Sequence, residues 1–142
     1  MSLTLDTART IIAGARAAGS RQGFKPLTVV VLDAGGHVLA VEREDGSSNK
    51  RFEVAYGKAH GALALGLGSR ALMARAEQQP WFIASVTAAV GGALVPVPGG
   101  VLVRDTDGSL VGAVGISGDT SDNDEAAAVE AIEQVGLAAQ PD

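Results

Sequence analysis

The residues best suited to bind a metal lie within one predicted helix. His60 follows Tyr56 by one helical turn and Glu53 by two turns, so the three side chains should line one side of that helix. A single imidazole can bind a haem iron or another metal ion, and a neighbouring carboxylate can orient it. We therefore take His60 as the candidate metal ligand, with a histidine at the helix surface or a subunit contact as the alternative. The other histidine, His37, follows a Gly-Gly turn and should be an exposed or half-exposed hairpin residue.

Three basic side chains are candidates for binding an anionic ligand. Lys58 lies on a different face of the helix from His60, and Arg51 precedes Lys58 by two turns. The two cations could therefore form an edge that binds a carboxylate. Arg43, just past the first predicted hairpin, is a further candidate. The alternative is that all three are ordinary solvated cations or partners of the chain's many acids.

An unusual predicted strand carries a glycine at every third position, in Gly112-Ala-Val-Gly-Ile-Ser-Gly118. Glycine weakens a strand, so glycines inside one usually mark a bulge or the close approach of a ligand or a second backbone. Because side chains alternate along a strand, Gly112 and Gly118 leave gaps on one face and Gly115 on the other. The three could form the floor of a ligand groove or allow tight packing, and both interpretations stay open. The spacing matches neither a dinucleotide-binding loop nor a serine-nucleophile turn.

An acidic segment, residues 119–125, follows this strand. Counted from Asp119, oxygen-bearing side chains fall at several calcium-loop positions, but Asp124 stands where such a loop needs glycine. We therefore favour a helix cap at Ser121 or Asp122, with acids in the first turn that the helix dipole stabilises. Asp119 remains a candidate ligand-binding residue at the end of the strand.

The pattern of apolar residues predicts the elements that position these side chains. Continuous or alternating β-branched residues indicate strands, and apolar residues at helical spacing indicate helices. The predicted strands are 27–32, 37–41, 101–103 and 110–117, with turns at 33–36 and 105–108 and a loop or sheet edge at 94–98. The predicted helices are 4–22, 49–65, 70–77, one that begins at Pro80 and closes at Gly91-Gly92, and 122–137. Two hairpins flanked by helices predict an α+β fold with helices packed on an antiparallel sheet.

The length, net charge and cysteine content of the chain limit the kinds of function that it can have. The chain has 142 residues and is expected to form a single domain over 1–142. Its net charge of −5 disfavours nucleic acid or an anionic membrane surface as the main partner. With no cysteine it has no thiolate metal site and no disulfide. Without a predicted signal peptide or membrane span, we expect a cytoplasmic protein.

Several motifs together resemble the GlcG/HbpS-like family, which includes the C-terminal domain of PduO-type proteins. The similarity covers nearly the whole chain, and the glycine-spaced strand is its most specific part. The matching segments are Val31-Leu-Asp-Ala-Gly-Gly-His37, Arg43-Glu-Asp-Gly46, Lys58-Ala59, Pro98-Gly-Gly-Val-Leu-Val-Arg104 and Gly112 to Gly118. The resemblance implies a profilin-like sheet covered by helices and assembly into homo-oligomers. It also implies that haem or iron is a ligand of some members.

These observations lead to one main hypothesis and two alternatives. The main one is a homo-oligomeric protein that binds haem, iron or a small carboxylated metabolite in a groove near a subunit interface. Its site would combine His60 as iron ligand with Arg43, Lys58, Gly112, Gly115, Gly118 and Asp119. The first alternative is an enzyme whose acid–base work falls to Asp45, Lys58 or Asp119, one of which would need a pKa near neutrality. The second is an oligomer that binds no small ligand.

Overall fold

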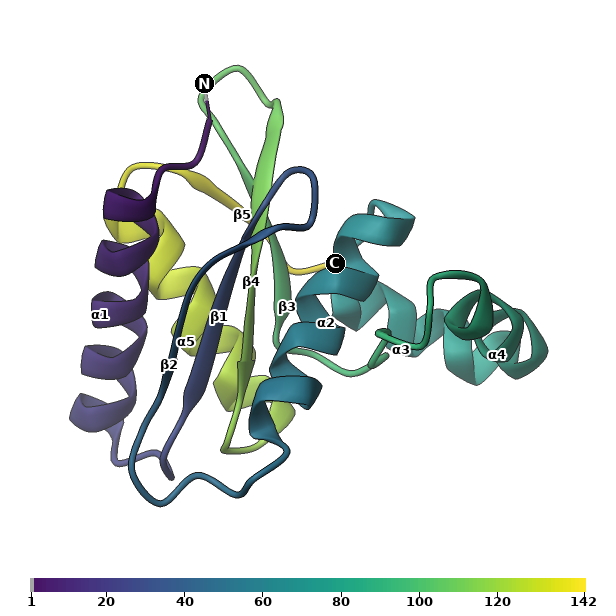
Figure 1. The fold of residues 1–142 in the computed structure, drawn as a ribbon, viewed down its shortest axis with the longest axis horizontal. Helices are drawn as coiled ribbons and strands as arrows, with labels where there is room; N and C mark the ends of the chain where they lie inside the picture. The colour runs from purple at the N-terminus through teal and green to yellow at the C-terminus, as the bar shows by residue number, and fades with distance from the viewer. Residues whose placement is uncertain (1) are drawn as a thin grey trace.

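The computed structural model describes residues 2–142 and shows the α+β fold expected from the sequence (Figure 1). The elements are α1 (Leu5–Gln22), β1 (Thr28–Asp33), β2 (Val38–Arg43), α2 (Arg51–Leu65), α3 (Ser69–Gln78), α4 (Pro80–Ala89), β3 (Gly100–Arg104), β4 (Leu110–Ser117), α5 (Ser121–Gln134) and β5 (Ala138–Gln140). The predicted helices and both hairpins are confirmed to within a few residues, and residues 94–98 form a loop as expected.

The five strands form one antiparallel sheet in the order β2-β1-β4-β3-β5. The glycine-spaced strand, β4, is central and pairs with both β1 and β3, so that Val114 lies opposite Val31 and Val101. The last helix differs from the prediction at its end, because it stops at Gln134 and not at residue 137. Gly136 has φ +80°, which breaks the helix, and the following residues pair with β3 as the edge strand β5.

Alternating side chains bury both faces of the sheet under helices. Val29 and Val31 point into a core shared with α1 and α5, whereas Val30 and Leu32 point into a second core beneath α2. Figure 1 shows α1 and α5 on one side of the sheet and α2 on the other. Burial on both faces explains why β1 is a continuous β-branched run.

The glycines of β4 serve this packing. A Cβ on Gly115 would meet the carbonyl oxygen of Ala55 and approach the Ala59 Cβ to 3.0 Å, so α2 lies directly on the β4 backbone. A Cβ on Gly112 would meet the β1 backbone at Leu32, and the Leu3 side chain at 2.9 Å. Both glycines are buried, which contradicts their assignment to the floor of an open groove. The prediction that they face opposite sides of the sheet is confirmed.

Helices α3 and α4 form an arm that extends away from the sheet (Figure 1). A small core of Leu72, Ile83 and Leu94 holds the arm together. Trp81, on the first turn of α4, is 67% exposed, which is unusual for so large an apolar side chain. Among the described helices, none is both long and apolar enough to cross a membrane.

Candidate functional site

His60 lies on α2, is partly buried, and is held in a defined orientation by a hydrogen bond. Its Nδ1 lies 2.8 Å from the carbonyl oxygen of Ala93, in the loop after α4. A carbonyl oxygen only accepts hydrogen bonds, so Nδ1 must carry the proton and donate it. In the neutral ring, Nε2 then keeps its lone pair. This is the arrangement that metal-binding histidines usually have.

His60 also ends a ladder of stacked rings along α2. The ring centroids of Phe52 and Tyr56 are 5.7 Å apart, and those of Tyr56 and His60 are 5.2 Å apart, with interplanar angles of 23° and 22°. The i, i+4 spacing places the three rings on one helix face, as predicted for Tyr56 and His60. Glu53 does not orient His60: it is exposed and lies 3.4 Å from the Lys50 ammonium. The Ala93 carbonyl takes the role expected of that carboxylate.

A shallow surface pocket of about 160 Å³ adjoins His60. Its other lining residues are small or apolar and come from the β1–β2 turn and the last turns of α2: Ala34, Gly35, Gly36, Leu63 and Ala64. Pockets that enclose a ligand usually measure about 300–1,000 Å³. The pocket of a single chain is therefore too small to enclose a large planar ligand, and a further wall would have to come from elsewhere.

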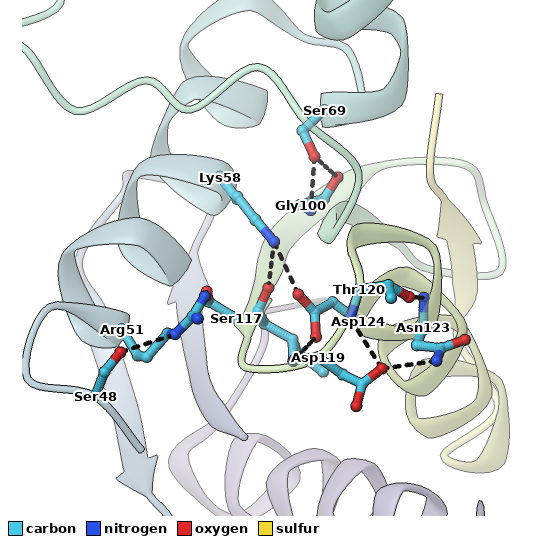
Figure 2. Close-up of polar contacts among 11 residues, drawn as sticks. Ser48, Arg51, Lys58, Ser69, Gly100, Ser117, Asp119, Thr120, Asn123 and Asp124 are labelled. Carbon is cyan, nitrogen blue, oxygen red and sulfur yellow. Dashed lines mark hydrogen bonds and ion pairs between the residues drawn. The ribbon is translucent and has the colours of Figure 1, made fainter. Parts of the chain in front are cut away.

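Lys58, predicted to face an anionic ligand, instead forms a buried ion pair with Asp124 (Figure 2). Its Nζ lies 3.1 Å from an Asp124 oxygen and 2.9 Å from the carbonyl oxygen of Ile116, and both charged side chains are 2% exposed. Burial lowers the pKa of Lys58 and raises that of Asp124, and the partner charge opposes each shift. The ligand role expected for Lys58 is wrong for this chain, because solvent does not reach its ammonium.

Asp119 connects β4 to the neighbouring segments. Its carboxylate accepts hydrogen bonds from the backbone N–H of Lys25 and Thr120 and from the side-chain amide of Asn123, at 2.7–2.8 Å. These bonds, that from Lys25 most strongly, lower the pKa of Asp119. A carboxylate held in this way is a poor general base at neutral pH.

The helix-cap interpretation of the acidic segment is correct, but the cap is one residue earlier than predicted. Thr120 accepts from the backbone N–H of Asn123 and caps α5. Asp124 faces Lys58 and the backbone N–H of Asp119. Within residues 2–142, no three or more histidine, aspartate or glutamate side chains gather as a metal site would require.

The remaining predicted residues lie apart from His60. Arg43 is exposed, and its Nη2 donates to the carbonyl oxygen of Ser47, which holds the β2–α2 loop. Asp45 lines a different surface pocket, beside Arg16 and Phe24. The structure therefore does not bring the three residues of the acid–base alternative together. Asp45 is exposed, Lys58 is buried in its ion pair, and the Asp119 carboxylate accepts three hydrogen bonds.

A sequence profile described as "Haem degrading protein HbpS-like" matches residues 3–133. The chain belongs to the HbpS-like family. This confirms the resemblance seen in the glycine-spaced strand and the surrounding motifs. No curated protein sequence is similar enough to count as a relative.

Solved structures of HbpS-like proteins share the fold. The chain is similar to a double mutant of Streptomyces reticuli HbpS, with 26% identity, 96% of this chain and 88% of the other covered, and a TM-score of 0.81. It is also similar in fold to the protein in the PduOC:heme complex, with 24% identity, 96% and 97% covered, and a TM-score of 0.85. Klebsiella pneumoniae ORFY has the same fold at 23% identity, with 92% and 88% covered and a TM-score of 0.82.

Proposed function

We propose that this HbpS-like protein binds haem and that His60 Nε2 is the iron ligand. One observation carries the proposal: His60 lines the adjoining pocket and donates from Nδ1 to the Ala93 carbonyl, which leaves Nε2 as an electron-pair donor. Family membership supports haem as the ligand. A haem complex is known for PduOC, which has the same fold.

The residues around His60 suit this group. A histidine is a common axial ligand of haem iron, and a hydrogen bond from its other nitrogen to a carbonyl fixes the ring and increases its basicity. Tyr56 and Phe52 continue the stack of rings from His60 towards the N-terminus of α2 and add a partly exposed aromatic surface beside it. When bound, haem would supply iron for redox or oxygen chemistry, and the protein would supply the ligand, the apolar wall and the orientation.

The proposal includes a second copy of the chain, which would complete the groove. The pocket beside His60 is too small to enclose a haem. Large apolar side chains remain exposed on the surface, notably Phe52 at the start of the ring ladder and Trp81 on the projecting arm. Exposed aromatic residues of this kind are enriched where subunits meet. A homo-oligomer would cover them and provide the missing wall.

A small carboxylated metabolite is the competing ligand for this groove. It would not depend on an iron ligand, so its binding would survive the loss of the His60 ring. We keep the cytoplasm as the proposed location, because a chain without cysteine needs no oxidising compartment.

Titration with hemin tests the proposal. We expect a saturable change in the Soret absorbance, with an end point that gives a fixed number of haems per oligomer. Mass determination by light scattering, before and after the titration, shows whether a second copy is present. A linear increase in absorbance without an end point would overturn the proposal.

A further inference from the structure

We propose that the protein has a second ligand site, at the start of α2, that binds the carboxylate or phosphate group of a small molecule. A surface pocket of about 190 Å³ lies there, between the end of β4 and the β2–α2 loop. The residues that would contact the ligand are Lys25, Ser47, Ser48 and Arg51. Figure 2 shows Arg51 reaching from α2 towards Ser117, with Ser48 beside it.

The charge of this pocket favours an anion. Within the described chain, its lining residues include two cations, Lys25 and Arg51, and no carboxylate. Arg51 donates from Nη1 to Ser117 Oγ and from Nε to Ser48 Oγ, both at 3.0 Å. A guanidinium has five N–H donors in a planar fork, so these two bonds leave three. The two hydroxyls fix the side chain without neutralising its charge, as in a preformed site for a carboxylate or phosphate.

A buried hydroxyl without a partner is independent evidence for a ligand. Ser47 lines the pocket, is only 5% exposed, and its Oγ has no hydrogen-bond partner. Among residues 2–142, one other buried side-chain atom lacks a partner: Thr28 Oγ1, whose residue lies opposite Ser117 in the sheet register. Buried hydroxyls are nearly always satisfied, so the unsatisfied hydroxyl of Ser47, which lines the pocket, indicates a missing partner there; Thr28 does not line the pocket.

The N-terminus of α2 also favours an anion in this pocket. Lys50, at the N-cap position, makes no side-chain capping bond. The first N–H groups of a helix carry partial positive charge and attract anions. Ser48 Oγ accepts from Arg51, so its own proton is available to donate. Arginine, lysine, two hydroxyls and a helix end thus converge on one small pocket.

The site is separate from the proposed haem site. Arg51 and His60 lie nine residues apart on α2, which is two and a half turns and a rise of about 13.5 Å. They therefore project from opposite sides of the helix. Gly118, expected to lie in a ligand groove with Asp119, lines this second pocket instead. Asp119 contacts Lys25 through the backbone N–H and does not line the pocket.

Calorimetric titration with inorganic phosphate, and separately with malonate, tests the inference at constant ionic strength. We expect saturable binding of at least one probe; phosphate alone indicates a phosphoryl ligand and malonate alone a carboxylate. Arg51→Gln should weaken that binding about tenfold or more. Ser47→Ala should weaken it without lowering stability, because its hydroxyl has no partner in the protein. If Ser47 had a structural role instead, Ser47→Ala would lower the urea concentration at the midpoint of unfolding.

The matched control is Arg9→Gln, which removes one positive charge from an exposed position of α1. It should bind the probe as the wild type does. The His60→Ala variant should also bind the phosphate or malonate probe as the wild type does, and the Arg51→Gln variant should still bind hemin. The two proposed sites can therefore be tested independently of each other. No saturable binding of either probe, or equal weakening by Arg9→Gln and Arg51→Gln, would overturn the inference.

Discussion

The Lys58 ammonium on α2 donates to the Asp124 carboxylate on α5 across the end of the central strand β4, at 3.1 Å (Figure 2). The two helices lie on opposite faces of the sheet, so this pair joins the two cores. Glycines make room for it: a Cβ on Gly99 would lie 2.8 Å from Lys58 Nζ, and one on Gly100 would meet the Lys58 backbone. The Pro98-Gly-Gly segment thus has a structural reason for its two glycines.

Removal of one partner of this pair should destabilise the fold strongly. Lys58→Met leaves the Asp124 carboxylate buried without its counter-charge, which typically costs about 3–5 kcal/mol. Urea unfolding measures the loss. The double variant Lys58→Met/Asp124→Asn should lose less than Lys58→Met alone, since it carries no buried charge. Wild-type stability in Lys58→Met would contradict the account of this pair.

Gly115→Ala should test whether β4 carries glycine for packing. The new Cβ would meet the backbone of α2 at Ala55, which cannot swing aside, so we expect a loss of about 1–3 kcal/mol or more. Gly14→Ala is the matched control. Its Cβ would meet mainly the flexible end of Gln134, and alanine favours the helix by up to about 1 kcal/mol. Equal effects of the two substitutions would argue against a packing role for Gly115.

The stability of the protein should depend on pH through Asp119. Its pKa is lowered in the folded state, chiefly by the Lys25 N–H, so between the two pKa values the unfolded chain binds more protons. The stabilisation is therefore present above the ordinary pKa of 3.8 and is lost as pH falls through the lower folded value. Urea midpoints of wild type and Asp119→Asn should converge on acidification. A difference that stays constant with pH would contradict this role.

Local patterns were sufficient to predict most of the fold. The β-branched run of β1, the two turns, and the apolar stripes of α1 and α2 are signals carried by neighbouring residues. The strand β5 was missed because Ala138–Gln140 is short and has no β-branched residue; its strand geometry comes from pairing with β3. Short edge strands of this kind depend on tertiary contacts.

The candidate site was harder to predict because its contacts join distant parts of the chain. Helical spacing correctly placed His60 beside Tyr56, but Ala93, 33 residues later, sets the ring orientation. Lys58 and Asp124 are 66 residues apart, and nothing local marks them as partners. The sequence linked Arg51 to Lys58 as one anion-binding edge, whereas in the structure Arg51 donates to Ser48 and Ser117.

Trp81 should contribute to assembly. It is 67% exposed on an arm that projects from the sheet, and tryptophan is enriched among the residues that contribute most to binding at protein interfaces. Trp81→Lys should lower the molar mass measured by light scattering, while circular dichroism remains that of a folded chain. Because a second copy is proposed to complete the groove, hemin affinity should fall with the mass. An unchanged mass would exclude the arm from the interface.

Hemin titration of His60→Ala beside His37→Ala tests the central claim most directly. The two variants remove the chain's two imidazoles one at a time, and His37 is an exposed turn residue paired with Asp33. We predict that wild type and His37→Ala develop the same Soret band, that His60→Ala loses or shifts it, and that added imidazole restores it. An unchanged Soret band in His60→Ala would contradict the assignment of His60 as the iron ligand.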